Sequence, residues 1–589
     1  MATVKNPNAD KTKIRELRKL FQQCKRPLIW VGLFSLASNV LMLALPIYSL
    51  QVLDRVINSF NMDTLIFLSL VVVASIGFYG FFTGIRSTVL SRLSDWLVAQ
   101  LSPRLMSVAV ENSAVGLPAS AGQFQRELSN LKNFISGQGV TSLLDAPWSI
   151  IFILTIYLIN PVLGFIALMG AFLLLGFGVV VELSTKKPIN DATELTNRSM
   201  LFAESSSRNA EAIEAMGMLP TLTNLWNAQT RHVQDLTMQA SDRSNTLVSL
   251  SRFLRLTLQV ATTGMGAWLA LHNELTVGAM IASSILMGRA LAPFEAAIGI
   301  WKQWIQARDA YHRIDSVLTE VPRMRGTMKM PEPGGTLTVE QLVYKPPRSG
   351  NPIIKGVAFS LKAHESLGLI GPSAAGKSTL AKLLMGILPP TAGSVRLDGV
   401  DIFHWNRADL GQYVGYLPQS VELFPGTIRD NIARMEPGAK DEDVIAAAKF
   451  AGCHEMILRL PQGYETEFSQ QLLSLSPGQR QRIGLARALY KNPSFVVLDE
   501  PNTNLDGEGE VALRETIQRM QKAGITFVLV AHKPSIVTHV DKILMLQDGV
   551  IKDFGSRDAV LAKYTGSSNP SAARKGKTAK LVKPEAIEE

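Results

Sequence analysis

The chain has 589 residues, 47% of them hydrophobic, and a formal net charge of +10. This length exceeds one ordinary domain, so we expect two or more. The basic charge does not indicate nucleic-acid binding, because aromatic side chains do not alternate with the basic ones, and the only cysteines, Cys24 and Cys453, are too few for a disulfide framework or a cysteine-rich zinc site.

Residues 1–27 form a basic N-terminal segment, because Lys and Arg recur up to Lys25 and Arg26. Positive residues beside a membrane span favour the cytoplasmic side and attract anionic headgroups. The apolar run that follows is too long for the core of a signal peptide and lacks a small-residue cleavage site, so we expect no cleavable signal.

Residues 28–321 read as a transmembrane domain. A helix needs roughly 20 apolar residues to cross a bilayer, and six such runs occur, at about 28–50, 63–84, 141–160, 162–182, 254–271 and 277–299. The long loops between them, 85–140 and 183–253, hold most of the Lys and Arg, which predicts that these loops, the N-terminus and the C-terminal half are cytoplasmic. We expect the long loops to be helical, so that the spans extend far into the cytosol.

Ionisable residues lie within predicted spans, among them Asp145, Arg289 and Glu295. Such residues are costly in a bilayer and usually face a bundle interior or a pathway. One interpretation is that they line a translocation route or its gate. The other is that they are paired, or lie near the interface and extend toward water.

Three segments follow the membrane domain. Residues 322–336 are rich in Pro, Gly and Met, which predicts a linker. Residues 337–563 read as a soluble α/β domain. Residues 564–589 are rich in Ser, Ala and Lys without an apolar period, which predicts a disordered basic tail.

Residues 371–378, Gly-Pro-Ser-Ala-Ala-Gly-Lys-Ser, fit the phosphate-binding pattern G-x-x-x-x-G-K-[ST]. A strand-like run precedes the motif and a helical run follows it, which argues against a chance glycine-rich turn. Glycines let backbone N–H groups surround phosphate oxygens at a helix N-terminus. Lys377 would bridge the β- and γ-phosphates, and Ser378 would bind Mg²⁺.

A second motif, Phe495-Val-Val-Leu-Asp499-Glu500, is an apolar strand that ends in two carboxylates. Asp499 can hold Mg²⁺ through water, and Glu500 can polarise an attacking water. The alternative is a buried strand with capping acids, which the phosphate-binding motif upstream disfavours.

Between these motifs lies Leu475-Ser-Pro-Gly-Gln479, which resembles the LSGGQ signature of the ATP-binding-cassette (ABC) family. The resemblance covers the whole second half of the chain. Gln419 resembles the Q-loop, Asn504-Leu505-Asp506 the D-loop and His532 the switch histidine, while Tyr344 stands where the family stacks an aromatic ring on adenine. The implied fold is an α-helical six-span ABC exporter domain fused to an α/β P-loop nucleotide-binding domain.

The resemblance also implies the roles of the site residues, with ATP and Mg²⁺ as cofactors. Catalysis falls to Glu500, His532 and Gln419, and Mg²⁺ binding to Ser378, Gln419 and Asp499. Nucleotide binding falls to Tyr344, Gly371, Pro372, Ser373, Ala374, Ala375, Gly376, Lys377, Ser378, Thr379, Ser476, Gly478, Gln479 and Asp506. ATP would lie between the P-loop of one subunit and the signature helix of the other in a head-to-tail homodimer, and hydrolysis would separate the halves.

Two features depart from the family pattern. Pro477 replaces a glycine of the signature, which removes one backbone N–H. Residues 468–474 lack the glycine-rich pattern common upstream of exporter signatures. This departure bears on how the ATPase domain communicates with the membrane loops, and not on ATP binding.

Narrower similarity comes from residues 145–148, 209–218 and 498–510, which resemble type I protein-secretion ATPases of the protease- and haemophore-exporter subgroup. This implies a multi-pass protein of the bacterial inner membrane that lacks an N-terminal peptidase domain. It would export unfolded protein carrying an uncleaved C-terminal signal, with a periplasmic membrane-fusion adaptor and an outer-membrane channel. Short helices near 115–130 and 208–222 would dock on the ATPase. Alternatives are an exporter of lipid, drug or peptide, and an ATP-gated channel or regulatory membrane ATPase. The sequence does not name the cargo.

Overall fold

The computed structural model describes residues 16–116, 121–320, 329–347, 350–468, 475–531 and 536–565. The chain divides into two compact units, Met1–Pro322 and Arg323–Glu589, which are described separately. The division falls at the start of the predicted linker. Much of the predicted N-terminal segment and tail lies outside the described residues, as do the first part of the linker and residues 469–474 upstream of the signature.

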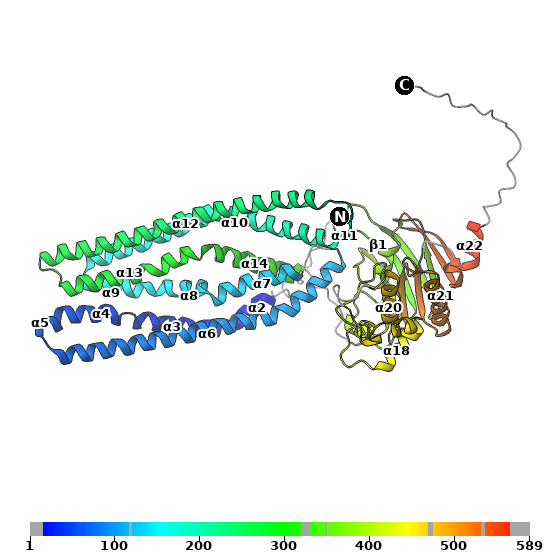
Figure 1. The fold of residues 1–589 in the computed structure, drawn as a ribbon, viewed down its shortest axis with the longest axis horizontal. Coiled ribbons are helices and arrows are strands. Elements are labelled where there is room, and N and C mark those ends of the chain that lie inside the picture. Colours follow the sequence, from blue (N-terminus) through cyan, green and yellow to red (C-terminus); the bar gives the residue numbers. More distant parts are fainter. Residues whose placement is uncertain are drawn as a thin grey trace, which may run out of the picture. The chain divides into compact units, whose positions relative to one another are not determined.

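Unit 1 is a bundle of helices. Figure 1 shows α10, α12 and α13 lying side by side along its length. The helices are α2 Glu16–Gln23, α3 Lys25–Leu41, α4 Ala44–Gln51, α5 Ile57–Ser59, α6 Met62–Ala114, α7 Ala121–Ser136, α8 Gln138–Asp145, α9 Ser149–Ile159, α10 Pro161–Arg208, α11 Ala210–Ala215, α12 Leu219–Leu271, α13 Val277–Gly299 and α14 Trp301–Glu320. Buried Leu174, Leu258 and Met287 join three of them in one apolar core.

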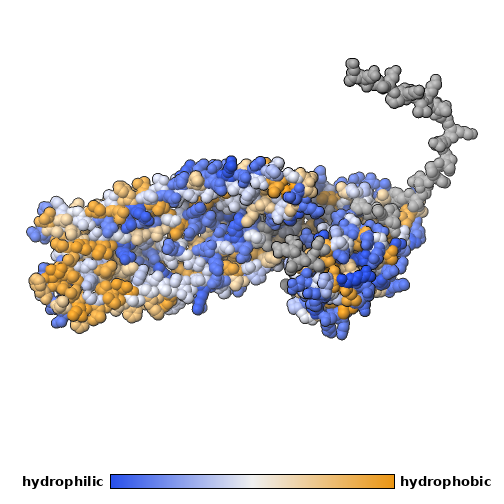
Figure 2. Space-filling model, in the orientation of Figure 1, coloured by the Kyte–Doolittle hydropathy of each residue, from blue (hydrophilic) through white to orange (hydrophobic). Residues whose placement is uncertain are grey.

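Five helical segments among the described residues are long and apolar enough to cross a membrane: Lys25–Ser59, Met62–Ala114, Gln138–Ile159, Pro161–Arg208 and Val277–Gly299. The predicted span at 254–271 is the C-terminal part of α12, where Arg255, Gln259 and several threonines dilute the apolar residues. Six spans therefore remain a prediction. Figure 2 shows hydrophobic side chains gathered over α4, α5 and the start of α6, where Phe67 and Leu70 are exposed.

Three helices are far longer than a bilayer is thick. Helices α6 and α12 have 53 residues each and α10 has 48, which corresponds to about 70–80 Å against a hydrocarbon core of about 30 Å. The prediction that the long loops are helical extensions of the spans is confirmed. A short helix, α11, lies within 208–222 as expected, whereas α7 near 115–130 is a 16-residue helix.

Two membrane segments are interrupted. Between α8 and α9 a 3₁₀ turn covers Ala146–Trp148, because Pro147 cannot donate to the helix ladder. Between α4 and α5 a π-helical turn covers Val52–Val56 and presents Asp54, which accepts hydrogen bonds from Thr276 Oγ1 at 2.5 Å and Gly278 N at 2.9 Å. This carboxylate therefore caps the start of α13.

Unit 2 contains one six-stranded and one four-stranded sheet. The larger has the order β12-β11-β3-β10-β9-β6, in which only β12 pairs antiparallel. The smaller is antiparallel, with the order β2-β1-β4-β5, and β7 pairs with β8. The strands are β1 Leu337–Tyr344, β2 Ile354–Leu361, β3 Ser366–Ile370, β4 Ala392–Leu397, β5 Val400–Asp401, β6 Val414–Leu417, β7 Gly426–Thr427, β8 Glu467–Phe468, β9 Phe495–Asp499, β10 Thr526–Val530, β11 Lys542–Gln547 and β12 Val550–Ser556.

Eight helices of unit 2 are described: α15 Lys377–Leu384, α16 Arg407–Leu410, α17 Ile428–Ile432, α18 Asp441–Phe450, α19 His454–Leu458, α20 Pro477–Leu489, α21 Gly507–Lys522 and α22 Arg557–Thr565. Strands β9 and β10 are buried along their whole length, and β10 lies between β9 and β3. Parallel strands place their carboxyl ends at one edge of the sheet. The sequence motifs after β3 and β9 therefore meet at that edge.

Candidate nucleotide-binding site

The loop after β3 has the conformation that its glycines permit. Gly371 and Gly376 have φ values of 155° and 100°, and a Cβ at Gly371 would collide with the carbonyl oxygen of Leu546. The loop apex around Ser373 and Ala374 is exposed, and α15 begins at Lys377. A helix N-terminus behind an exposed loop of this kind attracts anions through its free N–H groups and its dipole.

Lys377 lies beneath this loop. Its Nζ donates hydrogen bonds to the carbonyl oxygens of Gly371 and Pro372, each at 2.9 Å, and only 5% of the residue is exposed. Burial lowers the pKa of Lys377, an effect that the nearby carboxylates of Glu500 and Asp499 oppose. The ammonium group is thus already placed where a phosphate in the loop could replace its carbonyl partners.

Ser378 and Asp499 bring two oxygen atoms together at the end of β9. Ser378 Oγ donates to Asp499 Oδ1 at 3.2 Å. Burial raises the pKa of Asp499, the charge of Glu500 adds to this, and the bond from Ser378 opposes it. Both side chains offer the oxygen ligands that Mg²⁺ prefers, so Ser378 would hold the ion directly and Asp499 would hold it through water.

Glu500 follows Asp499 in a strained backbone conformation. Its φ is 51°, which is uncommon for a non-glycine residue and typical of functional turns. Its Oε2 accepts hydrogen bonds from Gln419 Nε2 at 3.1 Å and Thr503 Oγ1 at 3.3 Å. The structure thus brings the predicted base and the predicted Q-loop residue into direct contact. The metal role expected of Gln419 would use its amide oxygen and stays a prediction.

The signature segment caps α20. Ser476 Oγ accepts from Gln479 N at 3.2 Å, and Gln479 Oε1 accepts from Ser476 N at 2.9 Å, which forms a capping box. Pro477 occupies the first helical position, where its missing N–H costs little. Gly478 therefore carries the N–H of the first turn that neither this box nor the proline uses.

A cavity of about 530 Å³ opens beside this helix start, and Ser476, Gly478, Gln479 and Asp506 are among its lining residues. No hydrogen bond among the described residues joins these four residues to the loop 371–378. The loop after β3 and the cavity at the start of α20 are therefore separate features of the chain.

Sequence reasoning missed two residues that tie α20 to the turn after β9. Gln481 is 1% exposed; its Nε2 donates to the Glu500 carbonyl at 3.3 Å, and its Oε1 accepts from Asn504 Nδ2 at 3.2 Å. Arg482 Nη2 donates to Asp506 Oδ1 at 3.0 Å. Their polar character just after the signature, on an otherwise apolar helix face, was the signal available in the sequence.

Asp506 caps α21, because its Oδ1 accepts from Gly509 N at 2.8 Å, and this bond together with Arg482 lowers its pKa. Tyr344 ends β1 and is only 5% exposed, and burial raises its pKa. His532 lies outside the described residues. The nucleotide roles of these three residues stay predictions.

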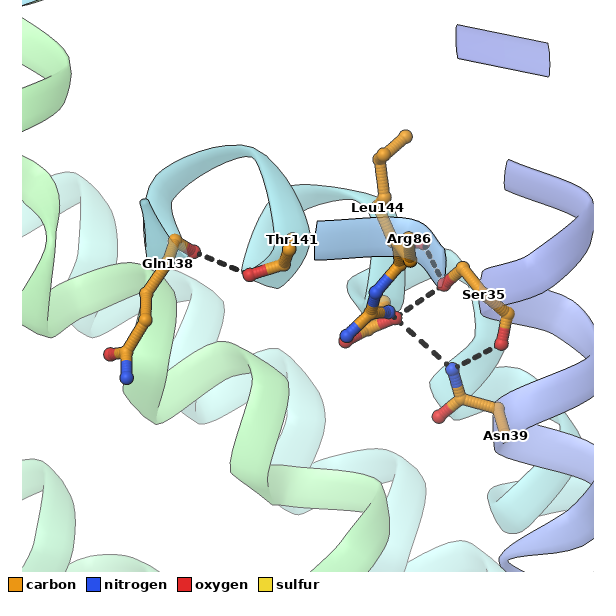
Figure 3. A network of polar contacts seen from close by, with 7 residues as sticks. Ser35, Asn39, Arg86, Gln138, Thr141 and Leu144 are labelled. Carbon is orange, nitrogen blue, oxygen red and sulfur yellow. Dashed lines mark hydrogen bonds and ion pairs between the residues drawn. The ribbon is translucent and has the colours of Figure 1, made fainter. Parts of the chain in front are cut away.

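Asp145 and Glu295 of the predicted spans form ion pairs. Asp145 Oδ1 accepts from Arg86 Nη1 at 2.6 Å, from Asn39 Nδ2 at 3.2 Å and from Ser35 Oγ. Figure 3 shows Ser35 and Asn39 of α3 beside Arg86 in this network.

Glu295 pairs with two arginines of α12, Arg255 at 2.5 Å and Arg252 at 3.1 Å. Arg289 differs, because it is exposed, lines a polar cavity of about 210 Å³ with Arg86 and Asp145, and forms no ion pair within the described part of the chain. The paired interpretation therefore describes Asp145 and Glu295, and the pathway interpretation is left with Arg289.

Comparison with known proteins gives matches along the whole chain. Residues 354–503 match the family "ABC transporter", and residues 28–293 match "ABC transporter transmembrane region". A type I secretion system ATP-binding protein of Rhizobium meliloti is 39% identical over 96% of both chains. A toxin RTX-I translocation ATP-binding protein of Actinobacillus pleuropneumoniae is 30% identical over 93% of this chain and 77% of its own. A bacterial Atm1-family ABC exporter with ATP bound shares the fold, with a TM-score of 0.79 at 22% identity over 94% and 99% of the two chains.

Proposed function

The chain belongs to the ABC transporter family, and we propose that it is the inner-membrane ATPase of a type I secretion system. The observation that carries this proposal is the 39% identity with a type I secretion ATP-binding protein over 96% of both chains. Similarity of this extent includes the membrane domain, whereas motifs of the ATPase alone occur in every class of ABC protein. We propose export of an unfolded protein that carries an uncleaved C-terminal signal, through a periplasmic adaptor and an outer-membrane channel.

The proposed working unit is a homodimer. Within one subunit the loop 371–378 and the start of α20 are separate, and each offers helix N–H groups suited to phosphate. Two subunits in head-to-tail arrangement would place Ser476 and Gly478 of one against a nucleotide held by Lys377 of the other. ATP would then bias the pair toward a closed state, and hydrolysis would reverse that bias.

The proposed chemistry follows from the contacts at the end of β9. Ser378, Asp499 and Gln419 would hold Mg²⁺, which neutralises charge on the β- and γ-phosphates when bound. Lys377 would exchange its two carbonyl partners for phosphate oxygens. Glu500, held by Gln419 and Thr503, would orient and polarise the attacking water. We assign the switch role to His532 on family resemblance.

We propose six spans, with the N-terminus, the long helical extensions and the ATPase domain on the cytoplasmic side. The excess of Lys and Arg in residues 85–140 and 183–253 supports this orientation. Helices as long as α6 and α12 can carry a displacement from the cytosol to the bilayer without an intervening loop.

Deletion of the gene followed by comparison of secreted proteins tests the function. We expect one or a few proteins to disappear from the medium and to return with the wild-type gene. A Glu500→Gln gene should not restore them, whereas Glu515→Gln, which changes an exposed carboxylate of α21, should. An unchanged set of secreted proteins together with altered lipid, drug or peptide efflux would favour the rival exporter class.

A further inference from the structure

A large apolar cavity of unit 1 plays no part in the nucleotide site. Its volume is about 580 Å³, and it lies between α2, the start of α3, α6, α7, α8 and α14. Most of its walls are apolar, and they include Phe21, Leu28, Leu97, Phe134, Leu143 and Trp304. Apolar cavities stay dry and take up apolar ligands, so this one suits a hydrocarbon chain.

The cavity lies at one end of a candidate membrane span. Leu28 is in the first turn of the span Lys25–Ser59, and Cys24, just before that span, also lines the cavity. Trp30 is 60% exposed close by, and exposed tryptophans are typical of the depth where headgroups meet acyl chains. The part of the cavity at Cys24 and Leu28 therefore lies where a lipid could insert a chain.

Positive charge flanks this position. Lys25 and Arg26 follow Cys24 directly and are exposed, and no carboxylate pairs with either in the part of the chain that the structure describes. Basic residues at a membrane surface attract anionic headgroups. Arg308, which also lines the cavity, lies 3.7 Å from Glu182 and is thereby partly neutralised.

We propose that this cavity binds an acyl chain of an anionic phospholipid, whose headgroup lies against Lys25 and Arg26. Helix α8 lies between this cavity and the polar network of the membrane unit. Leu143 and Leu144 face the apolar cavity, while Asp145 meets Arg86. Figure 3 shows the Leu144 side chain directed away from Ser35 and Asn39. A bound chain would support α8 from its apolar side.

Lipid retention tests the proposal. Full-length protein is equilibrated in nanodiscs of phosphatidylcholine with phosphatidylglycerol, extracted, and weighed by native mass spectrometry. Leu143→Trp fills the cavity, and Leu158→Trp adds the same bulk at a 76% exposed position of α9 as the matched control. We expect wild type and Leu158→Trp to retain phosphatidylglycerol and Leu143→Trp to lose it. Equal retention by both variants overturns the cavity as the site.

The headgroup is tested separately with Lys25→Gln/Arg26→Gln. We expect phosphatidylglycerol retention to fall several-fold while phosphatidylcholine retention stays unchanged. If wild type retains both lipids equally, the anionic headgroup plays no part and the proposal is wrong in that respect.

A second readout uses Cys24 and does not depend on a bulky substitution. In the Cys453→Ala variant Cys24 is the one remaining thiol of the sequence. We expect N-ethylmaleimide to modify it several-fold more slowly in nanodiscs with phosphatidylglycerol than in phosphatidylcholine alone, and equal rates would overturn the proposal. If deletion of residues 1–15 accelerated the reaction in every lipid, the chain's own N-terminus would be the occupant instead.

Discussion

Gln419 and Glu500 are in direct contact: the amide Nε2 of Gln419 donates a hydrogen bond to Oε2 of Glu500 at 3.1 Å. The two residues come from the ends of β6 and β9, which are neighbours in the six-stranded sheet. A side chain that would contact Mg²⁺ thus also orients the predicted base. When nucleotide and Mg²⁺ leave, a movement of Gln419 would therefore also change the orientation of Glu500.

Glu500→Gln should stop ATP turnover while leaving ATP binding intact. The change keeps the size of the side chain and an oxygen that can accept from Gln419 and Thr503, but removes the charge that polarises water. Loss of general-base assistance typically costs about 10²–10⁴-fold in rate. Single-turnover phosphate release, beside equilibrium binding of ATP, measures the two effects.

The same variant distinguishes an exporter driven by ATP hydrolysis from a channel that opens on ATP binding. A channel that only opens on ATP binding needs no hydrolysis, so Glu500→Gln would leave its transport unaltered. We expect export to cease in Glu500→Gln and to continue in the Glu515→Gln control. Export at the wild-type level with ATP turnover abolished would contradict the claim that hydrolysis drives export.

Lys377→Met should abolish the stabilisation of the protein by ATP without lowering the stability of the nucleotide-free protein. The pKa of Lys377 is lowered by burial, so burying the ammonium costs free energy that its two hydrogen bonds to carbonyl oxygens offset, and its removal should change stability little. A ligand at roughly 100 times its Kd stabilises by about 2.7 kcal/mol. Thermal unfolding with and without ATP measures both quantities.

Lys382→Met, on the exposed side of the same helix α15, is the control for that experiment. It should retain the ATP-dependent shift. If Lys377→Met also retained the shift, the assignment of Lys377 to phosphate binding would be wrong.

Asp499 predicts a pH dependence of stability. Burial raises its pKa, and Glu500 adds to the effect. Because the folded-state pKa lies above the unfolded value near 3.9, the contribution of Asp499 to stability is present below that value and is lost as pH rises through the folded pKa. Asp499→Asn lacks this titration, so nucleotide-free wild type should lose stability relative to the variant as pH rises toward neutral.

For Asp506→Asn we expect a pH dependence of stability, relative to wild type, that is opposite to that of Asp499→Asn. The pKa of Asp506 is lowered by Gly509 N–H and Arg482, so its contribution is present above the unfolded pKa and is lost as pH falls. Thermal midpoints of the three proteins across acidic to neutral pH test this contrast. Parallel pH profiles for all three would mean that neither carboxylate has a shifted pKa.

The nucleotide site could be predicted from the sequence because its parts are short contiguous motifs. Gly371 to Ser378 and Asp499-Glu500 carry their chemistry within a few residues, and the alternation of strand and helix dictates that they meet at one sheet edge. The contacts of Gln481 and Arg482 could not be predicted in this way. Their partners lie 19 and 24 residues away, and only the packing of α20 on the turn after β9 defines them.

The membrane unit illustrates a second limit. Hydropathy located the apolar stretches but not the polar contacts between them. The apolar run ends near residue 84, which predicts that Arg86 belongs to a cytoplasmic loop. In the structure α6 continues unbroken to Ala114, and its Arg86 forms an ion pair with Asp145. Hydropathy also gives no sign of the π-helical turn that carries Asp54. That turn is defined by a contact distant in sequence, in which the Asp54 carboxylate accepts a hydrogen bond from α13.

Removing one partner of the pair Arg86–Asp145 should destabilise the membrane unit more than removing both. The side chains are 10% and 23% exposed, and an unpaired buried charge costs about 3–5 kcal/mol, whereas replacing the whole pair by apolar residues is often neutral. Arg86→Met and Asp145→Leu should each lower the thermal midpoint in nanodiscs, and the double variant should recover much of the loss. Additive losses would show that the two residues act independently.

Arg289 and Glu295 should have different effects on export, although both lie on α13. Glu295 is paired with Arg252 and Arg255, so Glu295→Ala leaves two cations without a partner and should lower thermal stability along with export. Arg289 is exposed, so Arg289→Ala should leave stability and ATP binding unchanged. An exposed cation on a membrane helix needs water or a passing chain as its environment, which supports the interpretation that Arg289 lines the route. Arg289→Ala should therefore reduce export in a secretion assay while ATP turnover persists, and Arg289→Lys should restore part of it. Wild-type export by Arg289→Ala would exclude Arg289 from the pathway.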